Sequence, residues 1–289
     1  MVTRRVHKRQ MLLIEDEYVT QIIEYTLGYC LLKYDIDLHA IIIEANHIHR
    51  VDTDADGSRP DFIRDFHSLL ARQLNCHYDE GDSLFSGKQT SIVHNEEAGD
   101  ILNRIVYIMG NPVADGIERE GKNHQGMRKR WPIPDKVIQR PKIFWRSLDK
   151  GGVAPDEVTL SFTRPPVWDG LSDDELDDLI EKRVLEYEKE TRDARDEDGK
   201  PFRCDVTDEK PDPMSFPKSR HILFGLSPLI ASMDKKKRLK AIRRLQSFRE
   251  DHEIARLLKK AGVHNVVFPH GTYLAVRRWD VNVEPKPPN

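Results

Sequence analysis

Two extended segments joined by a tight turn, between residues 37 and 53, constrain the fold of this chain most strongly. Residues 37–44, DLHAIIIE, are apolar and rich in β-branched side chains, which favours a buried strand. The letters EANH then indicate a turn, and residues 47–53 predict a strand that returns beside the first. A pair of strands like this requires a sheet against which helices can pack.

Helical and extended segments alternate around this strand pair. Apolar side chains recur at helical intervals in three segments, residues 18–33, 58–76 and 95–113, and Gly110 and Pro112 end the helix in the last one. Further strands are predicted at residues 3–14 and 90–94. The resulting order, β-α-β-β-α-β-α over residues 1–118, predicts an α+β fold with a ferredoxin-like split βαβ sheet and a mostly helical C-terminal extension.

The remainder of the chain divides into three regions by composition. Residues 119–170 are expected to form a basic arm followed by one more strand. Residues 171–216 predict a long acidic helix that opens with a capping box, followed by a proline-rich linker. Residues 217–289 predict a basic helical region that closes with a strand or hairpin.

Charge is segregated along the chain, although the net charge is only −3. Residues 217–260 carry 13 basic and four acidic side chains, and residues 119–150 carry 10 basic and three acidic ones, whereas residues 171–200 are strongly acidic. Basic segments of this kind suit a polyanion such as nucleic acid. They are equally compatible with the solvated faces of helices.

The location expected from the sequence is the cytoplasm, with no membrane partner. No apolar run approaches the ~18 residues that a membrane helix needs. The basic N-terminus lacks the apolar stretch of a signal peptide. The three cysteines, Cys30, Cys76 and Cys204, lie far apart and show no zinc-binding spacing, which fits a reducing compartment.

Two histidines, His47 and His49, lie two residues apart on the returning strand. Side chains at this spacing point to one face of a strand, so the two imidazoles could bind a divalent metal together. The pattern also fits one surface histidine and one hydrogen-bonded core histidine. Downstream, Tyr107 and Asn111 are one helical turn apart. Alone, they would be interpreted as a core aromatic residue and a helix cap.

Together these features resemble the single-tyrosine HUH transposases, and most closely the REP-associated tyrosine transposases. The resemblance rests on HAIIIEANHIHRVDTD, RPDFIRDFHSLLARQLN, DILNRIVYIMGNPVADGI and the early VTRRVHKRQMLL, within residues 2–118. It implies a bacterial, nucleoid-associated enzyme that acts on single-stranded or hairpin DNA. Members of the family occur as monomers or as homodimers, and both states stay open for this chain.

The resemblance also implies a role for each matching residue. His47 and His49 would bind Mg²⁺ or Mn²⁺, and Asn111 would supply a third ligand. Tyr107 would attack a DNA phosphate, form a 5′-phosphotyrosine link and release a 3′-hydroxyl. Reversal of this step on another DNA end would complete strand transfer.

Candidate DNA contacts are expected in two basic segments, at the start of the first strand and in the arm. The residues are Arg4, Arg5, Arg128, Lys129, Arg130 and Trp131. Cations interleaved with an aromatic ring suit single-stranded DNA, where bases stack and phosphates are neutralised. The same pattern fits a tail that its aromatic residues clamp to the core.

The sequence departs from the family pattern in two places. Arg50, Asp52 and Asp54 replace apolar residues that usually follow the second histidine, and Arg50 should face away from the histidines toward a helix. Gly110 should shorten the tyrosine helix. These departures motivate an alternative, a non-catalytic DNA-binding protein derived from a transposase. A HUH nuclease of replication or conjugation is a third hypothesis, but no motor or relaxase domain is visible.

Overall fold

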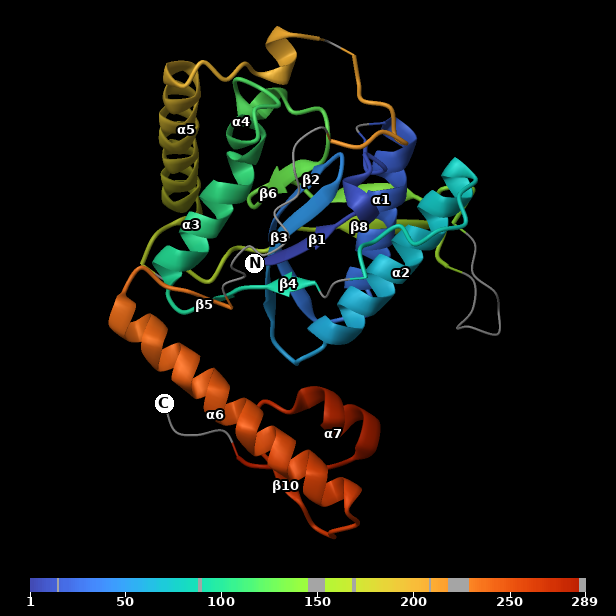
Figure 1. Ribbon diagram of the computed structural model, residues 1–289, viewed down its shortest axis with the longest axis vertical. Coiled ribbons are helices and arrows are strands. Elements are labelled where there is room, and N and C mark those ends of the chain that lie inside the picture. Colours follow the sequence, from blue (N-terminus) through green and yellow to red (C-terminus); the bar gives the residue numbers. More distant parts are fainter. Residues whose placement is uncertain are drawn as a thin grey trace.

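A five-stranded antiparallel sheet forms the centre of the molecule (Figure 1). The computed structural model describes residues 1–14, 16–87, 90–144, 154–167, 170–207, 209–217 and 229–285. The strand order is β4-β1-β3-β2-β6. The bounds are β1 Val2–Arg5, β2 Ile36–Glu44, β3 His47–Asp54, β4 Ser91–Ile92 and β6 Arg128–Arg130. The α+β class predicted from the sequence is confirmed.

Helices cover both faces of this sheet. The helices are α1 (Glu17–Leu31), α2 (Arg59–Tyr78), α3 (Ala98–Met109) and α4 (Asn111–Ala114). Phe62 of α2 lies against Arg50 of β3, whereas Tyr107 of α3 lies near His49 of the same strand. Because residues 49 and 50 point to opposite faces of a strand, α2 and α3 cover opposite sides of the sheet.

The central strands and helices have clear local causes. Ile41, Ile42 and Ile43 are at most 2% exposed, so β2 is buried on both faces, as its uninterrupted apolar run predicts. Helix α1 begins where the Asp16 carboxylate accepts hydrogen bonds from two backbone N–H groups of the first turn. Helix α3 begins with a capping box between Glu97 and Asp100.

Arg50 faces the α2 side of the sheet, as the alternation along β3 predicts. The side chain is 1% exposed, and its Nε donates a 2.5 Å hydrogen bond to Asp52, which also accepts one from Arg59. Burial alone would raise the pKa of Asp52, but Arg50 and Arg59 hold it at about 2. The guanidinium of Arg50 also lies 4.5 Å from the ring centre of Phe62. A paired, stacked cation therefore replaces an apolar side chain here.

The described part of the region expected to be an extended basic arm contains strands. Strand β6 extends the main sheet beyond residue 118, and β7 (Lys136–Gln139) pairs with β8 (Glu157–Leu160). The first strand is shorter than predicted, because β1 ends at Arg5 and a 3₁₀ turn follows at His7–Arg9. Positive φ angles at Lys8 and Arg9 end the extended conformation there.

Two long helices dominate the C-terminal half. Helix α5 (Asp173–Glu197) begins with a Ser172–Glu175 capping box, as predicted, and packs on α3 and α4. Helix α6 (Lys235–Lys260) lies away from α5 and packs with the chain's last elements (Figure 1). No helix in the described part of the chain is both long and apolar enough to cross a membrane.

The end of the chain differs from the predicted strand or hairpin. Helix α7 (Tyr273–Trp279) separates β10 (Val267–Phe268) from β11 (Asn282–Val283), and these two strands pair in parallel. Glu96 and Arg244 form an ion pair that joins α6 to the core. Short strands β5 (His94–Asn95) and β9 (Ile230–Ala231) also pair across this junction.

Candidate active site

The hairpin between β2 and β3 places Glu44 directly opposite His47. On the other side of β3, the neighbouring strand β1 pairs Arg5 with His47 and Thr3 with His49. Paired residues of adjacent strands project to the same face. Three strands therefore supply one polar patch on the face that α3 covers.

The two histidines lie side by side within this patch. Each residue is 7% exposed, and the ring centres are 4.6 Å apart with the rings at right angles. Burial lowers the pKa of His47 well below its usual value, with smaller contributions from His49 and Arg5. Burial and Arg5 lower the pKa of His49 to about 4. Both imidazoles are therefore neutral at pH 7, the form that binds metals.

Hydrogen bonding determines which His47 nitrogen is available to a ligand. Nδ1 of His47 lies 2.8 Å from Oδ1 of Asn46, and an amide oxygen can only accept, so with this amide assignment Nδ1 carries the proton. The unprotonated Nε2 then faces Oε2 of Glu44 at 3.4 Å. A lone pair and a carboxylate this close repel each other unless a proton or a cation lies between them.

Glu44, His47 and Asp115 form the one group of acidic, histidine or cysteine side chains with metal-ligand spacing among the described residues. Their ligand atoms all lie within 4.8 Å of one another. The predicted set of His47, His49 and Asn111 only partly coincides with this group. His49 lies beside it, and the Asn111 amide donates a 2.7 Å hydrogen bond to Glu44.

Sequence reasoning missed Glu44 and Asp115, and only the first had a local signal. A two-residue turn between residues 44 and 47 places these two side chains opposite each other, so the letters EANH already contained the pair. Asp115 follows α4 and approaches Glu44 only through the packing of α3 and α4 against the sheet.

Tyr107 approaches the histidines from α3. Its ring centre lies 6.0 Å from that of His49, with the ring planes at 84°. The tyrosine is half-buried, and burial raises the pKa of its hydroxyl, with a further contribution from the negative charge of Asp115. The phenol is therefore protonated at neutral pH and needs electrostatic help to act as a nucleophile.

Tyr107 and Asn111 do not share one continuous helix, contrary to the sequence prediction. Helix α3 ends at Met109, Gly110 has φ −85° and ψ 0°, and Asn111 begins α4. A Cβ atom at Gly110 would lie 2.4 Å from the Tyr187 ring of α5, so the close approach of α5 requires glycine.

A cavity of about 290 Å³ lies next to the Glu44–His47–Asp115 group. Arg5 and Arg9 line one part of it, and Arg203 reaches it from a segment after α5. The backbone N–H of Arg203 donates to the carbonyl of Gly116, which ties this segment to the residue after Asp115. Guanidinium groups around a carboxylate–imidazole group suit a phosphate-bearing ligand.

The two arginines of β1 lie on different faces of the sheet. Arg5 borders the cavity just described, whereas Arg4 lies 5.2 Å from the ring centre of Phe85 on the opposite face. Of this predicted pair, only Arg5 lies next to the candidate metal group.

The predicted contacts of β6 are engaged within the protein. Arg128 donates hydrogen bonds to Glu188 and to the carbonyl of Met109, and Arg130 forms ion pairs with two acidic residues of α5. Lys129 lies 3.9 Å from Glu24, and Trp131 is 8% exposed. The three basic side chains tie the edge of the sheet to α5 and α1, and Trp131 lies under the guanidinium of Arg164.

Comparison with known proteins gives no family assignment. No family model matches the chain, no curated protein matches it, and no solved structure matches it.

Proposed function

We propose that this protein nicks single-stranded or hairpin DNA with Tyr107 as nucleophile, and transfers the strand, with Mg²⁺ or Mn²⁺ at the Glu44–His47–Asp115 group. One observation carries the proposal. The His49 ring lies 4.6 Å from His47 and 6.0 Å from Tyr107, so it bridges the metal group and the phenol. Both imidazole rings lie on the face of the sheet that α3 covers. An ordinary core arrangement would allow one of them to lie on the opposite face.

The topology supports the same proposal. The elements β1-α1-β2-β3-α2-β4 form a sheet with the order β4-β1-β3-β2, which is the pattern of a split βαβ sheet. The two histidines lie in its second long strand, and the tyrosine lies on the helix after its fourth strand. These positions support the proposal, because the resemblance to HUH transposases implies histidines on such a strand and a tyrosine on such a helix.

The donor atoms fit a hard divalent cation. Two carboxylates and one imidazole nitrogen would hold Mg²⁺ or Mn²⁺, which prefer oxygen ligands and accept histidine. The cation would also remove the repulsion between Glu44 and the lone pair of His47. When bound, it would polarise the scissile phosphate and offset the charge that develops on the phosphate oxygens.

The remaining chemistry belongs to the side chains of the protein. The Tyr107 oxygen attacks the phosphorus, a Tyr–O–P bond forms, and the bond from phosphorus to the 3′ oxygen breaks. The phenol proton passes to the departing oxygen, which leaves as a 3′-hydroxyl. Arg5, Arg9 and Arg203 supply positive charge beside the reacting phosphate. A second 3′-hydroxyl attacking the phosphotyrosine restores the phosphodiester and frees the tyrosine.

A covalent-adduct assay tests the proposal directly. The wild-type protein is incubated with a labelled pool of random single-stranded DNA and Mn²⁺, and adducts that survive denaturing gel electrophoresis are counted. The wild type should form an adduct, EDTA should prevent it, and Tyr107→Phe should abolish it. Tyr187→Phe, which alters a neighbouring half-buried tyrosine, is the matched control and should retain the adduct.

The possible outcomes separate the hypotheses. An adduct that persists in Tyr107→Phe would refute the assignment of the nucleophile. Salt-sensitive binding of single-stranded DNA with no adduct at all would favour the alternative, a non-catalytic DNA-binding protein. Peptide mapping of the wild-type adduct should recover the DNA on the peptide that contains Tyr107.

A further inference from the structure

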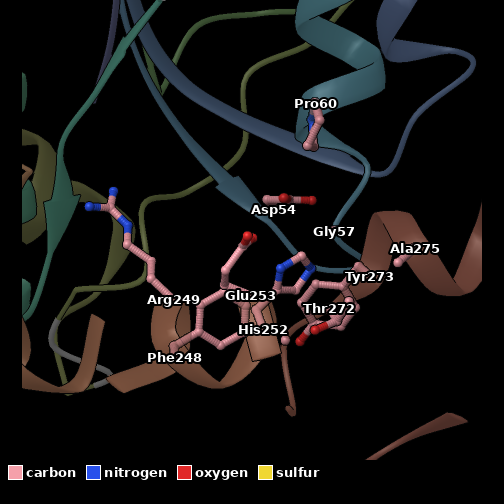
Figure 2. A pocket seen from close by; sticks show the side chains of 11 residues that line it. Asp54, Gly57, Pro60, Phe248, Arg249, His252, Glu253, Thr272, Tyr273 and Ala275 are labelled. Atoms are coloured by element: carbon pink, nitrogen blue, oxygen red, sulfur yellow. The ribbon is translucent and has the colours of Figure 1, made fainter. Parts of the chain in front are cut away.

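A second cavity, of about 470 Å³, lies where α6 and α7 meet the loop between β3 and α2 (Figure 2). Asp54, Gly57 and Pro60 line it from the core side. The volume falls within the range of small-molecule sites, ~300–1,000 Å³. Asp54 is the last residue of β3, roughly 23 Å along the strand from His47. The cavity is thus separate from the candidate active site.

Close packing defines one end of this cavity. Gly57 has a φ of +76°, and a Cβ atom there would lie 2.3 Å from the side chain of Tyr273. Only glycine both adopts this backbone conformation and admits the tyrosine. The sequence of the loop is therefore matched to the C-terminal region that closes the cavity.

The walls of the cavity combine aromatic rings with charged and polar side chains. Phe248, His252 and Tyr273 supply the rings, and Tyr273 is 45% exposed. Figure 2 shows these rings on one side, with Asp54 and Pro60 across from them. Aromatic rings that border an open cavity suit a flat, unstacked ring system such as a nucleobase.

The Asp54 carboxylate, which lines this cavity, has hydrogen-bonding capacity that no described residue uses. Its Oδ1 is buried and accepts no hydrogen bond from any residue that the structure describes, and its Oδ2 lies 3.8 Å from Arg59. Glu253, by contrast, is already held by Arg256 at 2.6 Å. A buried acceptor without a donor is unfavourable, so a ligand that brings donors would be bound there.

We propose that this cavity binds an unpaired guanine base of the DNA strand, with Asp54 accepting from the base and Arg249 near its phosphate. Guanine alone presents two adjacent donors, N1–H and N2–H, that match the two oxygens of one carboxylate. Cytosine and adenine place an acceptor beside their amino group, which a carboxylate repels. Arg249 is exposed at the cavity edge and forms no ion pair with a described residue. The choice of DNA as ligand rests on the proposed function.

Equilibrium binding measures this preference without any cleavage. The Tyr107→Phe protein is titrated with fluorescent dT oligonucleotides that carry a single dG, dC, dA or deoxyinosine, and anisotropy is recorded. The dG strand should bind at least about fivefold more tightly than all-dT, as a bidentate base contact predicts. Deoxyinosine, which lacks the N2 amine, should lose much of that advantage.

Variants assign the preference to Asp54. Asp54→Asn should remove the advantage of dG while dT binding persists, which also shows that the variant is folded. Asp251→Asn changes an exposed carboxylate on α6 that does not line the cavity, and it should keep the preference. Arg249→Ala should weaken all strands alike and reduce the salt dependence of binding.

The results distinguish this inference from the proposed function. Single-strand binding with no base preference, or a dG preference that survives Asp54→Asn, would overturn the guanine site and leave the nicking proposal intact. A parallel titration with free dGMP and dTMP needs no DNA strand. Selective binding of dGMP that Asp54→Asn abolishes would support the site even if the adduct assay failed.

Discussion

The side-chain amide of Asn111 donates a hydrogen bond to Glu44 across 2.7 Å, with both residues buried. The sequence resemblance makes Asn111 a metal ligand, whereas the structure makes it the partner of a carboxylate that faces His47. Asn111 therefore holds the Glu44 side chain in place, and Glu44 becomes the strongest candidate for direct coordination. The two assignments predict different effects of mutation.

Mn²⁺ binding distinguishes the two assignments. Glu44→Gln keeps the size of the side chain and its hydrogen bond from Asn111, but it removes the charge. We expect it to weaken Mn²⁺ binding at least about tenfold in calorimetric titration. Asn111→Ala should weaken binding less, because Glu44 remains charged. A larger loss in Asn111→Ala than in Glu44→Gln would restore the ligand set predicted from the sequence.

The Arg50–Asp52 pair should contribute strongly to the stability of the fold. Arg50→Ala leaves Asp52 buried with Arg59 as its ion-pair partner among the described residues and removes the contact with Phe62. We expect a loss of about 3 kcal/mol in the free energy of unfolding, measured by urea denaturation. Arg64→Ala is the control. The side chain of Arg64, on α2, is 53% exposed, so its removal should cost less than about 0.5 kcal/mol.

Stability should fall with acidification because of the buried histidines. The pKa of His49 is about 4 in the folded protein, below its ordinary value. His49 therefore contributes its full stabilisation when the pH is above that ordinary pKa, and this stabilisation is lost as the pH falls toward 4. The loss attributable to His49 is roughly 3 kcal/mol. Urea denaturation in EDTA between about pH 7 and about pH 4.5 should therefore show a shallower pH dependence for His49→Gln. Parallel curves would contradict the burial of a neutral His49.

The junction between α3 and α4 should tolerate no side chain. Gly110→Ala brings a Cβ atom against Tyr187, and we expect it to cost about 2 kcal/mol and to reduce adduct formation through a shift of α3. Gly99 lies in α3 with open space around it, so Gly99→Ala should be neutral or slightly stabilising. Equal effects of the two substitutions, in thermal denaturation and in the adduct assay, would rule out this packing argument.

Arg5 and Arg130 should differ in their effect on DNA binding. Arg5 lines the cavity beside the metal group, so Arg5→Ala should weaken single-strand binding and lower the slope of log affinity against log salt by about 1. Arg130 binds Asp177 and Glu181, so Arg130→Ala should lower the melting temperature and leave that slope unchanged. A changed slope in Arg130→Ala would return β6 to the DNA-binding surface.

Local patterns predicted the parts of the fold where periodicity and burial agree. The isoleucines of β2 and the alternation along β3 indicated a buried hairpin and the common face of His47 and His49. Asp115 could not be predicted, because no short-range pattern connects it with a residue 71 positions earlier in the chain. The resemblance identified Tyr107, and Gly110 indicated that the tyrosine helix is short, but nothing in the sequence indicated that Asn111 begins a separate helix and binds Glu44.

The C-terminal region was harder to predict because its elements depend on tertiary contacts. The letters VVFPHGTYLAVRRW contain apolar and aromatic residues that suggested a strand, yet Val276 is the only β-branched residue of α7. Pro269 and Gly271 interrupt any strand before that helix begins. The docking of Tyr273 against Gly57 and the burial of Ala275 then stabilise a helical turn.

The helix break at Gly110 assigns the proposed catalytic residues to different elements. Glu44, His47 and His49 belong to the sheet, whereas Tyr107 belongs to a helix whose last turn ends at a single glycine. Because the buried side chains of α3 belong to the same core as β2 and β3, a DNA end joined to Tyr107 would stay beside the carboxylate and imidazole groups. The proposed cutting and sealing steps would then take place at one location.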